Sequence, residues 1–271
     1  MNDALFLPEP VIRFGSFVLI FGILAVIELT HPRLERPEML AALKTRRWLT
    51  NVGMLVISSV ALRVLFPAAA VGTALWAESL EIGVFNQFDF PLWLAALISI
   101  IVLDFAVWLE HLLSHKIPIL WRIHRMHHAD TGFDVTTALR FHPLEIVLSM
   151  LWKAAIVVAL GAPAWSVLIF EVVLNGAAMF NHANISLPAR VDRIVRLLVV
   201  TPDMHRVHHS TDRRETDSNY GFNLAIWDRI LATYTDQPAK GHQDMDIGLA
   251  DYRDNAPTRL GWSLLLPFRR R

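Results

Sequence analysis

The sequence of 271 residues contains no cysteine, which excludes disulfide-stapled scaffolds and metal sites built from thiolates. Charged residues make up only 18%, whereas a typical soluble domain has about a quarter. The 25 cationic and 25 anionic side chains cancel, so no overall basic field would attract nucleic acid. These deficits argue against an ordinary cytosolic enzyme and against a nucleic-acid-binding protein.

Familiar cofactor motifs are missing as well. The chain has neither G-x-G-x-x-G nor G-x4-G-K-[ST], so no binding motif for a flavin, a nicotinamide or a nucleoside triphosphate is visible. H-E-x-x-H, the helix motif of zinc proteases, is also absent. Few carboxylates lie near the histidines, which argues against a carboxylate-bridged pair of metals. Any electrons that the chemistry needs must therefore come from a partner.

Apolar residues dominate the composition at 54%, with a mean hydropathy of +0.40. Long apolar runs cover residues 11–30, 50–76 with a probable break at Pro67, and 90–109, and a further pair covers 144–160 and 163–180. Runs of this length can cross a bilayer, and Gly161 with Pro163 suits a tight turn between the last two. We predict an all-α integral membrane protein with four or more transmembrane helices. The alternative is a large soluble all-helical protein.

The charges between the apolar runs predict an orientation. Residues 31–50 carry five cations, namely Arg33, Arg36, Lys44, Arg46 and Arg47. Residues 67–90 carry no Lys or Arg, but they include Glu78, Glu81 and Asp89. By the positive-inside rule the first segment is cytoplasmic, which places the later histidine-rich segments on the cytoplasmic side. The expected location is a bacterial inner membrane, with the endoplasmic reticulum as the alternative.

Two charges lie inside the 144–180 hairpin. Lys153 precedes Ala162 by nine residues and Glu171 follows it by nine, so an antiparallel hairpin would bring them to similar depth. Isolated charges in lipid are costly, which favours a pair between them. The alternative is that both side chains extend toward the membrane surface.

Histidine is abundant and clustered. Ten of the twelve histidines fall between 111 and 209, in the order His111, His115, His124, His127, His128, His142, His182, His205, His208 and His209. The spacings H-x3-H and twice H-x-x-H-H place rings on one helix face in each of three clusters. Eight imidazoles are enough for two metal ions, although imidazole suits Fe, Zn, Cu and Ni alike.

Three further residues complete the expected site. His182 is an additional candidate ligand, whereas His142 could be a ligand, a hydrogen-bond donor to one, or the residue that begins a helix before Pro143. Asp104 lies seven residues before His111 on the same helix face, so it could hydrogen-bond a liganding ring and fix its tautomer. His31 and His242 fall outside every cluster.

These motifs resemble those of the fatty acid hydroxylase/sterol desaturase superfamily of membrane di-iron enzymes. The resemblance covers nearly half of the chain, from about Asp104 to Tyr234. It is carried by Asp104 with His111 and His115, then by residues 121–128 (WRIHRMHH), 136–145 (TTALRFHPLE), 181–184 (NHAN), 201–210 (TPDMHRVHHS), 219–221 (NYG) and 227–229 (WDR). One departure is that the first motif usually reads H-R-x-x-H, while Leu112 follows His111 here.

The resemblance implies a cytosolic histidine-lined cap over a hydrophobic channel, two iron ions and O2 as oxidant. It further implies electrons from an external reductase chain of the ferredoxin, cytochrome b5 or flavoprotein type. The implied metal ligands are His111, His115, His124, His127, His128, His182, His205, His208 and His209. Residues 1–110 would then be N-terminal transmembrane helices, and 111–271 the catalytic region with three histidine motifs, interrupted by the membrane hairpin at 144–180.

The leading functional prediction is an O2-dependent oxidoreductase that hydroxylates or desaturates an aliphatic C–H position of a membrane lipid. Such a bond offers no acid, base or leaving group, so activated oxygen on a redox metal is needed. Two alternatives stay open. One is a non-enzymatic membrane metal-binding or transport protein, and the other is an inactive family member, which the Leu112 departure motivates.

Overall fold

The computed structural model describes residues 7–34 and 41–269, so Arg36, one of the cations used for the orientation, lies outside it. Six helices form an elongated bundle: α1 (Glu9–Thr30), α2 (Ala41–Leu65), α3 (Ala69–Ser79), α5 (Leu92–Lys116), α7 (Pro143–Leu160) and α8 (Ala164–His182). Within the described ranges the secondary structure is helical, apart from two isolated β-bridges. The all-α prediction is confirmed.

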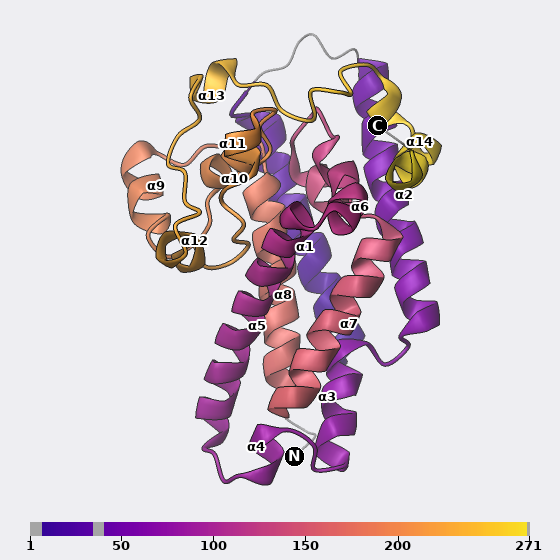
Figure 1. Cartoon of the computed structure of the whole chain (residues 1–271), viewed down its shortest axis with the longest axis vertical. Coiled ribbons are helices and arrows are strands. Elements are labelled where there is room, and N and C mark those ends of the chain that lie inside the picture. Colours follow the sequence, from indigo (N-terminus) through magenta and orange to yellow (C-terminus); the bar gives the residue numbers. More distant parts are fainter. Residues whose placement is uncertain (1–6, 35–40, 270–271) are drawn as a thin grey trace.

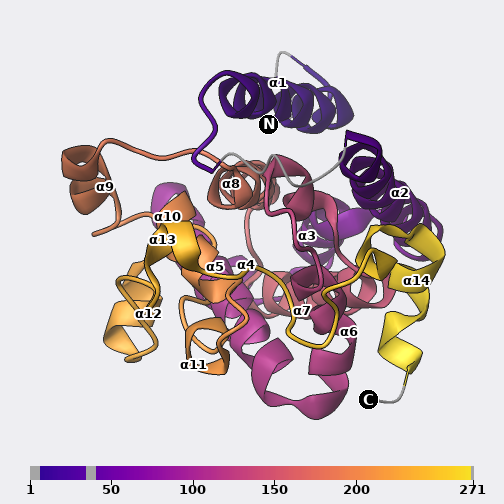
Figure 2. The same ribbon diagram turned by 90° about the horizontal axis from the view of Figure 1, so that it is seen from above.

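A cap of short helices covers one end of the bundle (Figure 1). It consists of α6 (Pro118–His128), η1 (Val135–Leu139), α9 (Ala189–Val195), α10 (Pro202–His208), α11 (Arg213–Thr216), α12 (Ile226–Ile230), α13 (Gly241–Asp244), η2 (Ala256–Thr258), α14 (Leu260–Leu265) and η3 (Leu266–Phe268). The short α4 (Val84–Gln87) lies at the opposite end. Seen from above, α10 to α13 lie near the upper ends of α5 and α8, whereas α14 lies beside α2 (Figure 2).

Five helical segments are long and apolar enough to cross a membrane: Glu9–Thr30, Leu43–Gln87, Leu92–Lys116, Pro143–Leu160 and Ala164–His182. The second contains α2 and α3, which are separated at the expected break around Pro67. Many large apolar side chains on these helices are exposed, such as Phe14, Val64 and Trp93 at 66–73%. Exposed apolar surface of this extent is costly in water and is suited to lipid. The prediction of four or more transmembrane helices is confirmed.

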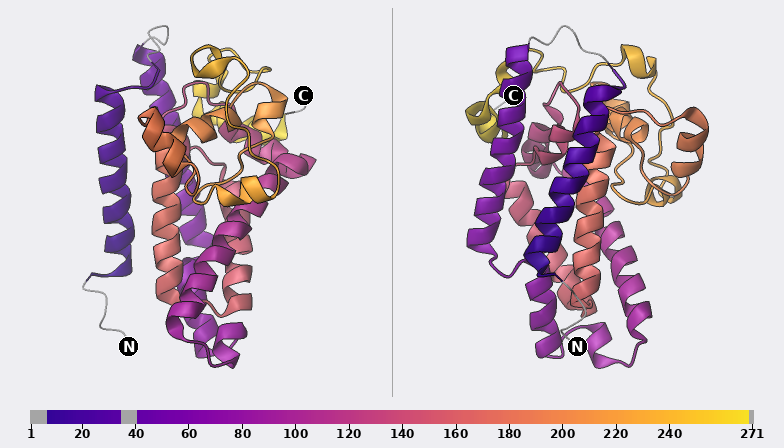
Figure 3. Two further views of the ribbon diagram at one scale, coloured as in Figure 1. Left: turned by 90° about the vertical axis from the view of Figure 1, so that its left-hand side faces the viewer. Right: turned by 180° about the vertical axis from the view of Figure 1, so that it is seen from behind.

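The hairpin of α7 and α8 runs the length of the bundle (Figure 3). Gly161 ends α7 in the left-handed conformation (φ 67°), and Pro163 is the N-cap of α8. A Cβ on Gly83, in the loop between α3 and α4, would lie only 2.2 Å from the backbone nitrogen of Gly161. The hairpin turn therefore packs against a loop at the end of the bundle remote from the cap. The expected domain boundary at 110/111 falls within α5, which runs from the bundle into the cap.

The charges inside the hairpin pair as predicted. Lys153 Nζ lies 3.2 Å from Glu171 Oε1, and the other carboxylate oxygen accepts a hydrogen bond from Arg13 on α1. Glu171 and Lys153 keep only 7% and 13% of their side-chain surface exposed. One anion thus joins α1, α7 and α8 at membrane depth.

A second buried network attaches the cap to α2. Arg47 contacts Asp130 and Asp134, which flank the end of α6 and the start of η1. Arg140 donates to Asn51 on α2, to Ser263 on α14 and to the carbonyl oxygen of Met126. These contacts fix the segment between α6 and α7 from several sides.

Replacing Glu171 with alanine should destabilise the protein, because two cations lose their shared partner at membrane depth. Removing one partner of a buried pair typically costs about 3–5 kcal/mol. Thermal unfolding in detergent should show the loss, whereas Glu78→Ala on an exposed part of α3 should leave the transition within about 0.5 kcal/mol. Equal transitions for the two variants would contradict the role assigned to Glu171.

Candidate metal centre

Nine histidines converge beneath the cap in two adjoining groups. The first group contains His111, His115, His124, His128 and His208, and the second contains His127, His182, His205 and His209. Within each group every residue offers a ring nitrogen within 4.8 Å of those of the other members. All nine rings are buried, and none is more than 4% exposed. The structure thus brings together every residue that the sequence analysis named as a ligand.

The local sequence explains how the rings reach this position. α5 and α8 deliver His111, His115 and His182 from the bundle. In α6 and α10 a proline stands at the first helical position, where its missing N–H costs nothing. Histidines three and four residues apart then share the inner face of each short helix.

Backbone carbonyls fix the orientation of four rings. The Nδ1 atoms of His111, His182 and His208 each lie 2.7 Å from a carbonyl oxygen, those of Tyr220, Ala178 and Ser218 respectively. His127 Nδ1 lies 3.1 Å from the carbonyl oxygen of Arg140. A carbonyl only accepts, so Nδ1 carries the hydrogen and Nε2 presents a lone pair.

These lone pairs face one another, which is the arrangement that a bound cation requires. His127 Nε2 and His182 Nε2 are 3.1 Å apart, yet neither carries a hydrogen to donate. Metal–nitrogen bonds of about 2.0–2.1 Å place neighbouring ligand nitrogens at roughly this separation. Several other buried ring nitrogens have no hydrogen-bond partner, including His115 Nε2, His208 Nε2 and both nitrogens of His209. The donor set therefore fits two metal ions, one in each group.

The electrostatics keep the imidazoles in the state that binds metal. Burial and the neighbouring rings lower the pKa of His127, His128, His205 and His209 well below 6.5. Burial lowers the pKa of His208 to about 3. These five rings are consequently neutral at pH 7, and neutral imidazole is the ligand form.

Glu145 also contacts the first histidine group. It lies in one of the sequence motifs, but the sequence alone predicts no role for it. Its carboxylate oxygen lies 2.6 Å from His124 Nδ1, so it holds this ring as the carbonyls hold the others. The same fixed tautomer follows for His124, whose Nε2 lies 3.2 Å from that of His111. Its place in the first turn of α7 suits an acidic side chain, but only the packing of α7 against α6 brings it to His124.

Asp104 occupies a different place from the one expected. Its two carboxylate oxygens accept hydrogen bonds from Asn223 Nδ2 at 2.8 Å and Trp227 Nε1 at 2.7 Å, and neither is directed at a histidine ring. It anchors the segment that follows Tyr220, whose carbonyl oxygen orients His111. Its connection to the histidines therefore runs through the backbone.

The remaining histidines lie outside both groups. His142 is the N-cap of α7, where Nδ1 accepts from the backbone N–H of Leu144 and Nε2 lies 3.2 Å from the carbonyl oxygen of Leu264. Of the three roles considered for His142, the structure favours the one at the helix start. His31 is exposed, and His242 is buried beside Asp203.

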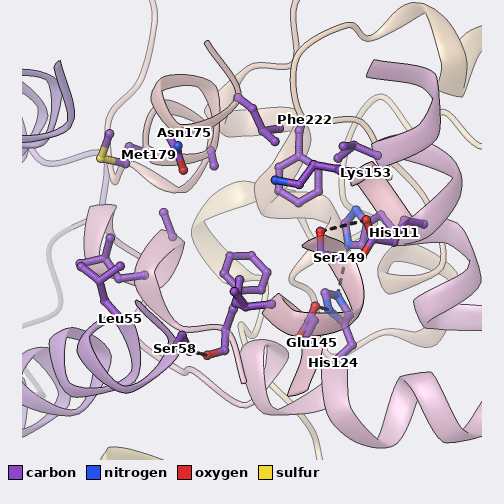
Figure 4. A pocket seen from close by; sticks show the side chains of 18 of the residues that line it. Leu55, Ser58, His111, His124, Glu145, Ser149, Lys153, Asn175, Met179 and Phe222 are labelled. Atoms are coloured by element: carbon purple, nitrogen blue, oxygen red, sulfur yellow. Dashed lines mark hydrogen bonds and ion pairs between the residues drawn. The ribbon is translucent and has the colours of Figure 1, made fainter. Parts of the chain in front are cut away.

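An apolar cavity of about 200 Å³ reaches the first histidine group from inside the bundle (Figure 4). Its walls come from α1, α2, α5, α7, α8 and η1, and His111 and His124 lie at one end. Apolar side chains such as Leu55, Met179 and Phe222 supply most of the lining. Polar side chains also line it, among them Glu110, Glu145 and Lys153, and Ser149 donates to Glu110 at 3.0 Å. A chain of methylene groups matches this lining.

The family follows from comparison with known proteins. The model of the fatty acid hydroxylase family matches residues 96–233, which contain all nine converging histidines. This match covers half of the chain, so the protein belongs to the fatty acid hydroxylase family.

Similar proteins include the ornithine lipid hydroxylase OlsE of Rhizobium tropici, 28% identical over 159 residues. Human alkylglycerol monooxygenase is 26% identical over 147 residues, and a cholesterol 25-hydroxylase-like protein of Danio rerio is 27% identical over 137. The matches cover 59%, 52% and 49% of this chain, and 47%, 30% and 53% of the respective relatives. The chain thus aligns with about half or less of each relative. No solved structure matches it significantly.

Metal-free protein should lose stability on acidification. The folded pKa of His208 is about 3, whereas its ordinary value is 6.5, so the unfolded chain binds the proton first as the pH falls. The stability contribution is complete above pH 6.5 and is lost progressively as the pH falls toward 3. Thermal unfolding of chelator-treated protein should show a lower midpoint at about pH 5 than at about pH 7.5. An unchanged or higher midpoint at the acidic pH would contradict the neutral buried state.

Glu145→Ala should weaken metal binding without removing a ligand, because His124 loses the acceptor that orients it. Losses of roughly 10–100-fold in affinity are usual for such partners. Competition with a chelator measures the metal affinity. The affinity of Glu145→Gln should lie between those of the wild type and Glu145→Ala, because its amide oxygen still accepts a hydrogen bond. Asp89→Asn, on an exposed loop at the far end of the bundle, is the matched control. Unchanged affinity in Glu145→Ala would exclude the orienting role.

Proposed function

We propose that this protein is an O2-dependent di-iron oxidoreductase that hydroxylates an aliphatic C–H position of a membrane lipid. The observation that carries the proposal is the pair of buried all-histidine groups at the end of an apolar cavity. The printed names of the relatives, which are lipid hydroxylases and monooxygenases, support hydroxylation over desaturation. They also support an enzyme over the transport protein or the inactive member considered from the sequence.

Iron fits the donor set because neutral imidazole binds it and because the reaction requires a redox-active metal. His111, His115, His124, His128 and His208 would hold one ion, and His127, His182, His205 and His209 the other. When bound, the two ions supply the activation of O2. Overall, R–H, O2, two electrons and two protons give R–OH and water, so a separate redox protein must supply the electrons.

The chain's own residues perform the remaining tasks. The apolar cavity walls align an alkyl chain and exclude water from the C–H bond to be attacked. Glu145 and the carbonyls of Tyr220, Ala178, Ser218 and Arg140 keep the ring nitrogens directed inward while the substrate is bound. Because the cavity walls belong to membrane-spanning helices, the lipid reaches the centre directly from the bilayer.

The proposed location follows from the same arrangement. The five candidate spans indicate a multi-pass protein. The loop charges favour a cytoplasmic cap. A bacterial inner membrane is the preferred location because one relative is bacterial. A cytoplasmic cap would face the cell's soluble redox proteins, of the ferredoxin, cytochrome b5 or flavoprotein type.

The function can be tested by expressing the chain in a bacterial host under ¹⁸O2 and analysing membrane lipids by mass spectrometry. We expect lipids carrying one ¹⁸O atom that are absent from cells with an empty vector. His127→Ala and His208→Ala, one from each group, should abolish this product, whereas His31→Ala, at an exposed histidine outside the groups, should retain it. Full product formation in either of the first two variants would refute the site assignment.

A further inference from the structure

The metal centre is sealed from solvent, which raises the question of how electrons reach it. All nine histidines are at most 4% exposed, and the sequence has no motif for an electron-carrying cofactor of its own. The proposed function, on which this inference rests, needs two electrons per turnover. They must therefore cross the cap from a docked partner, at a place where the path from surface to centre is short.

Trp121 supplies such a path. Its ring centroid lies 4.9 Å from that of His115 and 5.5 Å from that of His128, so it contacts two members of the first histidine group. On its other side the guanidinium of Arg213 lies 5.7 Å from the indole centroid. Trp121 is 9% exposed, and Arg213 is exposed. One aromatic ring thus separates the metal-binding rings from a surface cation.

The surface around Trp121 is cationic. Five exposed cationic side chains lie at the end of α5, on α6, on α11 and directly after η3, namely Lys116, Arg122, Arg213, Arg214 and Arg269. Two contacts join these elements, since Arg122 Nε donates to the carbonyl of Pro267 and Lys116 pairs with Asp217 beyond α11. The accompanying carboxylates are Asp212 and Asp217. We call these five cations the Trp121 patch.

The exposed charge has the opposite sign around α13. Around α13 and the segment after it, exposed Asp244, Asp246, Asp251 and Asp254 outnumber Lys240 and Arg253. Figure 2 shows α13 well separated from the turn between α5 and α6. Exposed cations also lie on α9, but the Trp121 patch is the place where surface cations meet an aromatic ring that contacts two of the histidines.

We propose that the Trp121 patch docks a small acidic iron–sulfur electron carrier and that Trp121 conducts the electron to the first histidine group. Complementary charge steers such encounters and favours fast, weak association. Each encounter oxidises one carrier by one electron and reduces the metal centre by one. Two encounters supply the two electrons of a turnover, while the two protons come from water.

Binding can be measured with metal-free protein in nanodiscs of zwitterionic lipid, using an acidic [2Fe–2S] ferredoxin as the probe. The double variant Arg122→Glu/Arg213→Glu should bind roughly tenfold more weakly, and raising the salt from about 50 to 300 mM should weaken the wild type. Arg190→Glu/Arg193→Glu on α9, with the same charge change on exposed residues, should bind within about twofold of the wild type.

Equal weakening in the two double variants, or none in either, would overturn the docking surface. The same holds if ferredoxin fails to bind while the patch variant loses association with anionic vesicles, because the patch would then bind lipid headgroups.

The path through Trp121 needs a separate measurement on iron-loaded protein. Trp121→Leu should leave the ferredoxin Kd unchanged but slow reduction by ferredoxin several-fold, with Trp121→Phe less affected because an aromatic ring remains. Reduction by dithionite, which needs no docking, should be unchanged in both variants. If Trp121→Leu slowed reduction by dithionite as much as reduction by ferredoxin, Trp121 would have a structural role only. Lipid hydroxylation that ferredoxin supports equally well in the wild type and in Arg122→Glu/Arg213→Glu would refute docking alone, whereas no hydroxylation with either reductant would refute the proposed function.

Discussion

The histidine centre depends on the hydrogen bonds that fix the tautomers of its imidazole rings. A histidine ring points a lone pair inward only if its other nitrogen donates outward, and here backbone carbonyls and Glu145 accept those hydrogens. The accepting groups come from α7, α8 and cap segments distant in sequence. The centre therefore forms only when bundle and cap are assembled together. The buried network of Arg47 and Arg140 serves this requirement by fixing the segment whose carbonyl orients His127.

The same helices cross the membrane and carry the centre. α5 begins at the far end of the bundle and ends with His111 and His115, and α8 ends with His182. Their inner faces also line the apolar cavity. Because the cavity and the histidines share these rigid elements, a bound alkyl chain would be placed relative to the metals by bundle packing. This coupling suits the proposed reaction on a lipid to a site built on membrane-spanning helices.

Much of this arrangement could be predicted from local sequence. Apolar runs locate the spans, Pro67 the break and Gly161 the hairpin turn, because each effect acts within a few residues. The Lys153–Glu171 pair also follows from symmetry about the turn, whereas the participation of Arg13 depends on which helix packs beside α8. Helical spacing likewise predicts which histidines share a face, but it does not divide His127 from His128 between the two groups. For the same reason the sequence pointed to Asp104 and assigned no role to Glu145, because the packing of segments distant in sequence decides which carboxylate contacts a ring.

The central claim is that the nine histidines hold two iron ions. Elemental mass spectrometry of detergent-purified protein, expressed with added iron and compared with a variant lacking His111 and His205, tests it most directly. We expect about two irons per chain for the wild type, because each group offers four or five buried imidazoles, and a substantial loss in the variant. Well-folded wild-type protein that retains no metal under these conditions would contradict the account.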